Sequence, residues 1–231
     1  MTPEEKARLV IDDKLRQSGW VIQDLKKLNL SSSLGIAVRE FPTSTGEVDY
    51  ALFVDGIPVG VVEAKRKEAG QNITDVEVQS GRYANSTFKW VKTDYFIRFA
   101  YEATDKLIRF TDYKDIKYRS RSVFSFHRPE TLLNLLRQPD TIRNNMKHFP
   151  AFDETGFRKC QITAIRNLDA SFAENRPKAL VQMATGAGKT FTAITAAYRL
   201  LKYGKMNRIL FLVDTRGLGE QAEREFLAYR P

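Results

Sequence analysis

Cysteine is almost absent from this chain of 231 residues. The single cysteine, Cys160, excludes an internal disulfide and a thiolate metal cluster. The two histidines, His127 and His148, stand far apart in the sequence and show no zinc-ligand spacing. These absences exclude a disulfide-stapled secreted domain and a zinc finger. They suit a reducing cytoplasm, where we expect the protein to act.

Long apolar runs are missing as well. The longest, such as residues 209–213, are far too short to span a bilayer. Residues 1–20 carry charges throughout, which is unlike a signal peptide. No internal repeat or low-complexity tract is visible. We therefore expect a soluble, intracellular protein without a membrane partner.

What remains is the composition of a basic globular protein. The chain is 42% hydrophobic and 28% charged, which is sufficient for a core and argues against disorder. Its length suits one or two domains. The net charge of +9 favours a polyanionic partner such as nucleic acid or nucleotide phosphate, the alternative being a basic but indifferent surface.

The first part of the chain, residues 1–138, predicts one domain of helices and strands. A helix is expected from the N-cap Thr2 to Gly19, with first-turn acids. Its apolar stripe is Leu9, Val10, Ile11 and Leu15. The expected strands are 31–41, 48–54, 57–65, 95–103 and 106–113, and further helices are expected at 72–86 and 128–139.

The remaining residues predict a second domain with a different pattern. Residues 139–156 are polar, irregular and bounded by prolines, and we interpret them as a linker. From residue 157, helices alternate with short apolar runs, which predicts β-α-β units and a parallel sheet buried on both faces. The expected elements are helix 157–174, strand 178–184, helix 188–203, strand 207–214 and helix 218–228.

The stretch GVVEAKRK, residues 60–67, places Glu63 and Lys65 on one face of an apolar strand. If the preceding hairpin loop is centred on Gly56, Glu63 pairs with Asp49, and their Cβ atoms lie about 5 Å apart. Two carboxylates so close indicate a divalent cation between them, and Mg²⁺ is the usual choice beside phosphate. Lys65 would then orient an attacking water or stabilise developing charge.

The register of this hairpin depends on its turn. Asp55 and Gly56 form a strong signal for a two-residue loop, which would pair Asp49 with Val62 and break the metal site by one residue. Pro58, just beyond the turn, is compatible with a wider loop. The sequence leaves both registers open.

The stretch MATGAGKT, residues 183–190, lies between an expected strand and an expected helix, as a phosphate-binding P-loop requires. Its glycines let backbone N–H groups face inward, toward phosphates at the positive end of the following helix. Lys189 can reach the β and γ phosphates, and Thr190 can ligate Mg²⁺. One departure is Met183, where the strict pattern has its first glycine. The predicted ATP-binding residues of this loop are Thr185, Gly186, Ala187, Gly188, Lys189 and Thr190.

The segment around this loop resembles the first RecA-like domain of superfamily 2 helicases and translocases. FRKCQITAI, residues 157–165, is similar to their adenine-recognition motif, which implies that Gln161 contacts adenine with Arg158 close by. RILFLVDTRGLGEQA, residues 208–222, resembles the next motif. There the resemblance implies DNA-backbone contacts by Thr215 and Arg216.

The family's Walker B strand and second RecA-like domain would follow residue 231. We therefore interpret the chain as the front portion of a larger motor that carries half of an ATP site, so that we do not expect it to hydrolyse ATP productively or to translocate alone.

The spacing Asp-x13-Glu-x-Lys, from Asp49 to Lys65, resembles the PD-(D/E)xK nuclease motif. QSGRY is similar to the QxxxY motif that follows the catalytic strand in one branch of these nucleases. That resemblance implies that Gln79 and Tyr83 support the site or contact DNA. The alternatives are a solvated edge hairpin and a polar helix face. The first-helix acids Glu4, Glu5 and Asp12 are interpreted as solvent-facing charges or as a further metal contact.

Together the motifs resemble the restriction (motor and endonuclease) subunit of type I restriction-modification enzymes over essentially the whole chain. The expected fold is α/β. A PD-(D/E)xK nuclease-like domain at 1–138, with a mixed sheet flanked by helices, precedes the linker and the beginning of a RecA-like parallel α/β domain at 157–231. The resemblance implies cleavage of double-stranded DNA that depends on Mg²⁺ and ATP, with methylation and specificity subunits as partners.

Two other functions stay open at this point. One is a non-catalytic DNA-binding or assembly domain of a superfamily 2 helicase. The other is a nuclease–helicase of DNA repair or of another restriction class.

Overall fold

The computed structural model describes residues 3–44, 46–65, 97–176 and 178–230, with side chains from Arg8 onward. The chain divides into two compact units, Met1–Pro139 and Asp140–Pro231. The helix expected at 72–86, and with it Gln79 and Tyr83, lies outside the described residues. No helix in the described ranges combines the length and the apolar character that a bilayer crossing requires.

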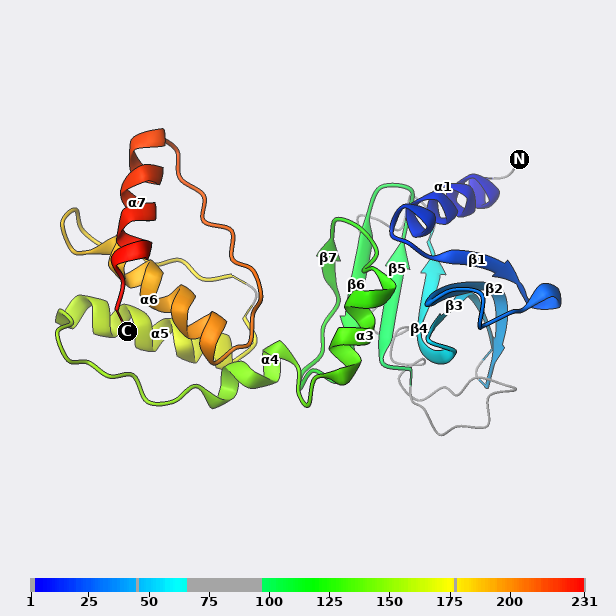
Figure 1. Ribbon diagram of the computed structural model, residues 1–231, viewed down its shortest axis with the longest axis horizontal. Coiled ribbons are helices and arrows are strands. Elements are labelled where there is room, and N and C mark those ends of the chain that lie inside the picture. Colours follow the sequence, from blue (N-terminus) through cyan, green and yellow to red (C-terminus); the bar gives the residue numbers. More distant parts are fainter. Residues whose placement is uncertain (1–2, 45, 66–96, 177, 231) are drawn as a thin grey trace. The chain divides into compact units, whose positions relative to one another are not determined.

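The first unit is built on a seven-stranded mixed sheet in the order β1-β2-β3-β4-β5-β6-β7 (Figure 1). The strands are β1 (Val21–Asp24), β2 (Gly35–Thr43), β3 (Gly46–Val54), β4 (Ile57–Ala64), β5 (Phe99–Ala103), β6 (Ile108–Asp112) and β7 (Arg121–Val123). The pairs β1–β2 and β4–β5 are parallel, and the other neighbours are antiparallel.

The five central strands agree with the predicted ones, because each has a long apolar or alternating run. The edge strands β1 and β7 were not predicted. They have four and three residues, too few for a periodic pattern, so only their pairing with β2 and β6 makes them strands.

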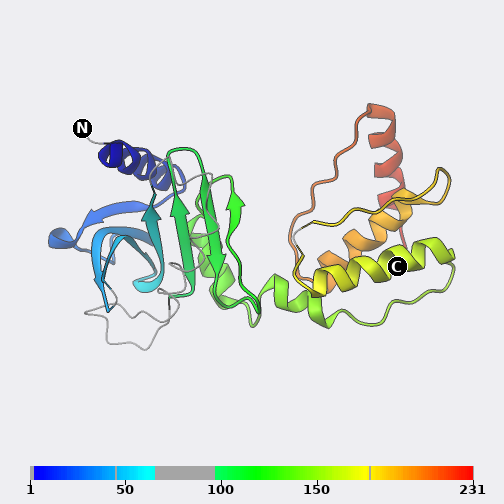
Figure 2. The ribbon, with the colours of Figure 1, turned by 180° about the vertical axis from the view of Figure 1, so that it is seen from behind.

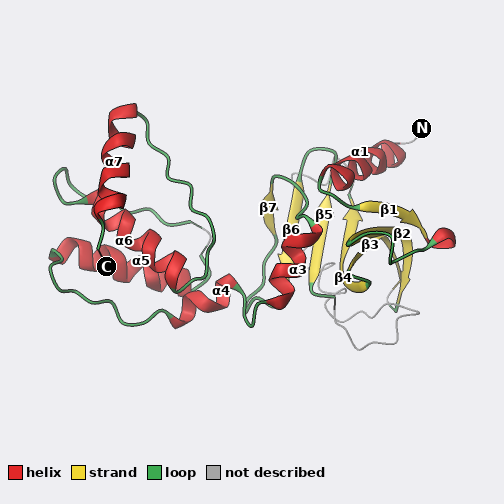
Figure 3. Ribbon diagram, in the orientation of Figure 1, coloured by secondary structure: helices red, strands yellow, loops and turns green. Residues whose placement is uncertain are grey.

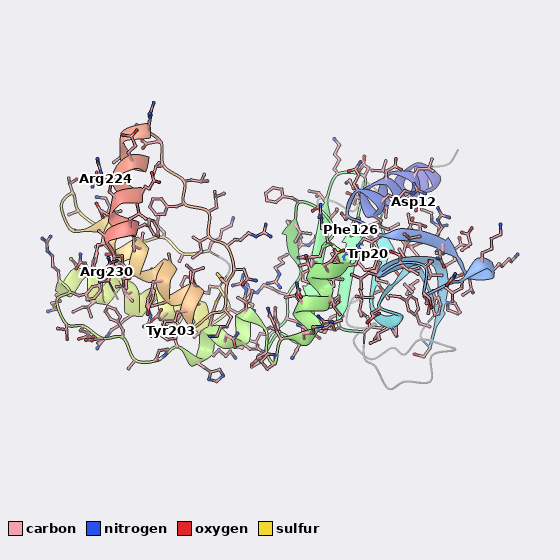
Figure 4. The ribbon with its side chains drawn as sticks, viewed as in Figure 1. Asp12, Trp20, Phe126, Tyr203, Arg224 and Arg230 are labelled. Atoms are coloured by element: carbon pink, nitrogen blue, oxygen red, sulfur yellow. The ribbon has the colours of Figure 1, made fainter. Side chains whose placement is uncertain are left out.

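Two helices pack on one face of this sheet, α1 (Pro3–Gln17) and α3 (Pro129–Arg137). Ile11 and Leu15 of α1 and Leu132 of α3 are fully buried in one cluster with residues of the sheet. α3 lies in front of the sheet in Figure 1, and the strands stand before it in the reverse view of Figure 2. Trp20 and Phe126, labelled in Figure 4, belong to the same cluster.

The predicted stripe of α1 is partly wrong. The side chains of Leu9 and Val10 are 50% and 37% exposed. Asp12, labelled in Figure 4, is only 4% exposed and is therefore buried. Asp12 lies about one helical turn from Leu15 and Arg8, so it faces the sheet with them, whereas Leu9 and Val10 point away. The burial of Asp12 also corrects its interpretation as a solvent-facing acid.

Side chains alternate between the two faces of the central strands, as the pleat requires. Tyr50 and Val62 belong to the cluster under α1 and α3. Ala51, Phe53 and Val61 belong to a second cluster on the opposite face. Both faces of β3 and β4 are therefore packed, and these strands offer a rigid support for polar groups at their ends.

The second unit is helical in its described part. Its elements are α4 (Ile142–Asn145), η4 (Met146–His148), α5 (Lys159–Ala173), α6 (Lys189–Lys202) and α7 (Arg216–Ala228). α5 packs against η4 and α6, and α6 packs against α7. The stretch interpreted as an irregular linker, 139–156, thus contains two short helices, and Met146 within it is buried. Packing against α5 orders residues that look irregular in the sequence.

A buried arginine joins α6 to α5. Arg199 is 5% exposed and its Nη2 lies 2.8 Å from Oδ2 of Asp169. The same nitrogen donates to the carbonyl of Pro150, and the guanidinium lies over the rings of Phe149 and Phe152. The charge is therefore paired, hydrogen-bonded and shielded from water, which lets it sit inside the helical unit.

The strands expected at 178–184 and 207–214 are not strands in the structure (Figure 3). Leu180, Leu210 and Leu212 are 93%, 81% and 80% exposed. An apolar run favours burial, but a parallel strand exists only when neighbouring strands complete its hydrogen-bond ladder. In the described part of this unit no strand lies beside either run, so the expected parallel sheet is absent there.

Candidate functional site

The β3–β4 hairpin combines a tight turn with a bulge. Asp55 and Gly56 have φ angles of 52° and 73°, the left-handed conformation that a two-residue hairpin turn requires. The register then shifts between Leu52 and Phe53, leaving Val59 as an extra residue on β4. The hairpin therefore has the two-residue turn, Asp55 and Gly56. The extra residue in β4 then shifts the pairing by one position, so that the strands beyond it follow the register expected for the wider loop.

Beyond the bulge, Tyr50 pairs with Val62. Continuing this register by one residue places Asp49 opposite Glu63, as the first interpretation of the hairpin requires. A hydrogen bond supports it, because the backbone N–H of Ala64 donates to Oδ2 of Asp49 at 2.8 Å. Val62 and Ala64 pack toward the cluster under α1 and α3, so Glu63 lies on the other face of β4.

The acidic row extends across neighbouring strands. Glu63 pairs with Glu102 on β5, and Glu102 pairs with Arg109 on β6. Residues in register on adjacent strands share a face, so these carboxylates lie at one level of the sheet. Glu102 was not predicted as a site residue, because only the β4–β5 pairing brings it beside Glu63.

Lys65 follows the last residue of β4. Its backbone N–H donates to the carbonyl of Ala103 at 2.7 Å, so β4 remains anchored to β5 up to this residue. Lys65 thus lies two positions after Glu63, at the same end of the strand. The three predicted residues Asp49, Glu63 and Lys65 are therefore brought to one end of the hairpin.

Sequence reasoning missed the arginine that contacts this site. Arg8 of α1 donates from Nη2 to Oδ1 of Asp49 and from Nη1 to Oε1 of Glu40, both at 2.8 Å. Glu40 lies opposite Asp49 between the pairs Arg39–Tyr50 and Phe41–Val48, and its φ of 48° is left-handed. A signal existed, since Arg8 shares a helical face with Ile11 and Leu15, where a charge needs a partner.

Asp12 is held apart from the hairpin carboxylates. Its Oδ1 accepts a hydrogen bond from the hydroxyl of Tyr50, and its Oδ2 pairs with Arg39. Arg39 also pairs with Asp24. Burial and the Asp12 carboxylate raise the pKa of Tyr50, so the phenol keeps its proton as a donor. Asp12 therefore docks α1 on the sheet.

Two carboxylates near the end of the hairpin, Asp49 and Glu63, are candidate ligands for Mg²⁺. No group of three or more His, Cys, Asp and Glu side chains able to hold a metal occurs in the described ranges. Mg²⁺ does not require one, because it is commonly held by one or two carboxylates, waters and substrate phosphates. Asp49 and Glu63 carry carboxylates of this kind, and each Asp49 oxygen accepts one hydrogen bond in the structure, from Arg8 or from Ala64.

The predicted phosphate loop, residues 183–190, leads into α6 with the backbone that its glycines were expected to allow. Gly186 and Gly188 have φ angles of 75° and 82°, and Gly188 is the N-cap of α6. Lys189 and Thr190 are the first residues of that helix, preceded by Thr185 and Ala187 in the loop. The Nζ of Lys189 donates to the carbonyl of Ala184 at 3.2 Å, so the ammonium folds back over the loop.

The predicted adenine motif lies directly against this loop. Gln161 is 5% exposed and its Nε2 donates to the carbonyl of Ala187 at 3.2 Å. Arg158 donates from Nη1 to the carbonyl of Gly186 at 2.7 Å, and its backbone N–H donates to Oε1 of Gln161. A Cβ at Gly188 would lie 2.2 Å from Nε2 of Gln161. The two motifs are thus interlocked, with little room for any side chain between them.

The predicted DNA contacts lie at the start of α7. Thr215 is its N-cap, and its hydroxyl accepts a hydrogen bond from the N–H of Leu218 at 3.4 Å. Arg216 pairs with Glu220 one turn later, and its side chain is 93% exposed. Both residues are accessible, and neither contacts the phosphate loop through a described hydrogen bond.

Two protein-family models match separate parts of the chain. The model "Type I restriction enzyme EcoKI endonuclease subunit second domain" matches residues 29–103. The model "Type III restriction enzyme, res subunit" matches residues 154–231. The first match contains the hairpin with Asp49 and Glu63, and the second contains the phosphate loop.

Curated relatives match most of the chain. The "Type I restriction enzyme EcoKI endonuclease subunit" of Escherichia coli (strain K12) is 32% identical over 275 residues, covering 95% of this chain and 23% of the relative. The "Type I restriction enzyme SauCOLORF180P endonuclease subunit" of Staphylococcus aureus (strain COL) is 26% identical, covering 80% of this chain and 21% of the relative. The chain thus spans less than a quarter of the length of these relatives.

Among solved structures, a fragment described as an HsdR subunit of a type I restriction enzyme from Vibrio vulnificus YJ016 is similar to this chain. It is 19% identical, with a TM-score of 0.41, and the match covers 90% of this chain and 39% of that one.

Proposed function

Because the chain belongs to the family of type I restriction enzyme endonuclease subunits, we propose that it carries their DNA-cleaving site and the first part of their ATP-driven motor. The reaction is Mg²⁺-dependent hydrolysis of a phosphodiester bond in double-stranded DNA, coupled to ATP-dependent translocation. The observation that carries this proposal is the bulged register of the β3–β4 hairpin. Continued by one residue beyond the Tyr50–Val62 pair, this register brings Asp49 opposite Glu63, with Lys65 two positions further along.

In this mechanism the hairpin supplies the ligands and the charge. Asp49 and Glu63 would hold Mg²⁺, and the ion would supply polarisation of the scissile phosphate and a lower pKa for a bound water. The N–H of Ala64 fixes the direction of the Asp49 carboxylate before substrate arrives. Lys65 orients the attacking water or stabilises the charge that develops on the phosphate. Gln79 and Tyr83 would support this site or contact DNA.

The second unit holds ATP in this proposal. The backbone of Thr185 to Gly188 and the start of α6 would cradle the phosphates. Lys189 would pair with them, and Thr190 would ligate the Mg²⁺ that accompanies ATP. Gln161 and Arg158 lie against the loop and would recognise the adenine. The family match over residues 154–231 supports this assignment as the beginning of a RecA-like motor.

The two units correspond to two roles in the proposed assembly. The first unit is the PD-(D/E)xK nuclease, and the second leads into the motor, with Thr215 and Arg216 contacting the DNA backbone. Methylation and specificity subunits would recognise the DNA sequence, so this chain cuts without reading bases. The net charge of +9 suits a DNA partner, and the proposed location is the cytoplasm.

The test is substitution in the complete restriction enzyme. Asp49→Ala, Glu63→Ala and Lys65→Ala should each abolish DNA cleavage while DNA-dependent ATP hydrolysis continues, because the nuclease and the motor are separate units. Cleavage retained by all three variants would contradict the nuclease assignment. ATP hydrolysis lost together with cleavage would indicate instead that the hairpin is needed for assembly.

One observation favours a second function, a hairpin that docks a partner without catalysis. Arg8 already neutralises Asp49, as in an ordinary structural ion pair. The two functions differ in metal binding. A catalytic hairpin binds Mn²⁺ through Asp49, whereas a docking hairpin binds none, and calorimetric titration of the 231-residue chain distinguishes them.

A further inference from the structure

Arg8 lies where its positive charge serves two carboxylates at once. Its Nη1 is 2.8 Å from Oε1 of Glu40 and its Nη2 is 2.8 Å from Oδ1 of Asp49. The two acids face each other across β2 and β3, so without a cation they would repel one another. The single guanidinium of Arg8 therefore neutralises Glu40 and Asp49 together, as a metal ion would neutralise a pair of carboxylates.

We propose that Arg8 is a built-in competitor of the divalent cation at Asp49. The guanidinium neutralises Asp49 and Glu40 while the metal is absent, and it opposes metal binding as long as it stays. This inference rests on the proposed nuclease function. It adds a residue of α1 that sets how much Mg²⁺ the site requires.

The competition follows from charge and distance. An ion bound to Asp49 would lie within roughly 4–6 Å of a guanidinium that touches the same carboxylate, and two positive charges at that distance weaken each other's binding. Burial lowers the pKa of Arg8, but its hydrogen bonds to Glu40 and Asp49 raise it further, so the net shift is upward. Arg8 therefore keeps its proton and its positive charge. Its side chain has to move away from Asp49 when a metal ion binds there.

The structure lets Arg8 move without releasing its helix. Its side chain is 45% exposed, and Glu40, its second partner, is 60% exposed. Other residues of α1 hold the helix on the sheet. Asp12 is hydrogen-bonded to Tyr50 and Arg39, and Ile11 and Leu15 are fully buried. These contacts join α1 to the sheet independently of the Arg8 side chain.

The experiment measures Mn²⁺ binding to the 231-residue chain by electron paramagnetic resonance of the free ion. Arg8→Gln removes the charge and should tighten Mn²⁺ binding by at least about threefold. Arg8→Lys keeps a positive charge and should remain within about twofold of the parent chain. Arg16→Gln is the matched control on the same helix. Arg16 pairs with Asp13 and Asp12 and does not touch Asp49, so this change should leave the affinity unaltered.

A second readout is the thermal midpoint of unfolding with EDTA and with Mn²⁺. Arg8→Gln should lower the midpoint in EDTA, since Glu40 and Asp49 then repel, and should increase the stabilisation by Mn²⁺. If Arg8 only positioned Asp49, the same variant would weaken Mn²⁺ binding. Unchanged or weaker binding in Arg8→Gln therefore overturns the competitor role.

The failures of the two proposals are distinguishable. If neither the parent chain nor Arg8→Gln binds Mn²⁺, or if Asp49→Asn leaves binding intact, the metal site of the proposed function is wrong and the competitor role falls with it. If Asp49→Asn abolishes binding but Arg8→Gln does not tighten it, the nuclease site stands and only the role of Arg8 is overturned.

Discussion

The N–H of Ala64 donates to Oδ2 of Asp49 at 2.8 Å, joining β4 to β3 at the open end of the hairpin. This bond comes from the backbone, so it fixes the direction of the carboxylate whether or not Arg8 occupies the other oxygen. The side chain that we propose as a metal ligand is thus held by the fold before any metal arrives. Metal binding at this site needs little side-chain ordering, which lowers its entropic cost.

Asp49→Asn separates this structural bond from metal binding. The amide oxygen can still accept from Ala64, so we expect a loss of stability of no more than about 1–2 kcal/mol in urea denaturation. Cleavage by the complete enzyme should fall by about 100-fold or more, because a neutral amide is a poor Mg²⁺ ligand. Asp13→Asn, on an exposed acid of α1, is the control and should keep full cleavage. Full cleavage by Asp49→Asn would exclude this residue as a ligand.

Lys189→Ala tests the coupling of the two units. The ammonium lies over the phosphate loop at the start of α6, so its loss should reduce ATP hydrolysis by about 100-fold or more and stop cleavage as well, because cleavage follows translocation. Lys202→Ala, at the other end of the same helix, should leave both activities unchanged. DNA cleavage that persists without ATP turnover would break the proposed link.

Gly188→Ala tests how the loop and Gln161 interlock. The added Cβ would lie 2.2 Å from Nε2 of Gln161, at a φ of 82° that alanine rarely adopts. We expect destabilisation of about 1–3 kcal/mol and loss of ATP binding, measured by urea denaturation and by a fluorescent ATP analogue. Gly217→Ala is the matched control, since a Cβ there meets nothing within 4 Å in α7. Equal effects of the two changes would contradict the interlocked geometry.

His127 makes stability depend on pH. Burial, with a contribution from Arg121, lowers the pKa of His127 from 6.5 to about 4, and Nδ1 of the neutral ring bonds the hydroxyl of Tyr101 at 2.7 Å. The unfolded chain takes up a proton first as pH falls, so this contribution is complete above pH 6.5. It declines from there to about pH 4, by at most about 3 kcal/mol.

Urea denaturation between pH 4 and 7 measures this dependence, with His127→Gln as the comparison. The parent chain should lose more stability over this interval than the variant, in which no imidazole titrates at this position. Identical pH profiles would show that His127 is protonated equally in the folded and unfolded chain. His148, which is exposed, remains in both proteins and cancels in the comparison.

Local chemistry in the sequence predicted much of the fold and the backbone conformation of the two turns beside the candidate site residues. The central strands have apolar patterns of sufficient length, and Asp55-Gly56 specifies the tight turn because both residues tolerate positive φ. The phosphate loop was predictable for the same reason, since its two glycines adopt the left-handed backbone. These features depend on neighbours in sequence, where a pattern is sufficient.

Features that depend on distant partners were decided by the tertiary structure. The turn alone would pair Asp49 with Val62. The bulge at Val59 restores the register in which Asp49 lies opposite Glu63, and the sequence pattern did not predict this bulge. The apolar runs at 178–184 and 207–214 resemble strands, but no strand lies beside them in the described part of the second unit. Arg8 reaches Asp49 across 41 positions of sequence, because packing of Ile11 and Leu15 brings α1 onto the sheet. The sequence by itself determined which residues can form turns, strands and a phosphate loop, and only long-range packing decided which carboxylates meet and which cation lies between them.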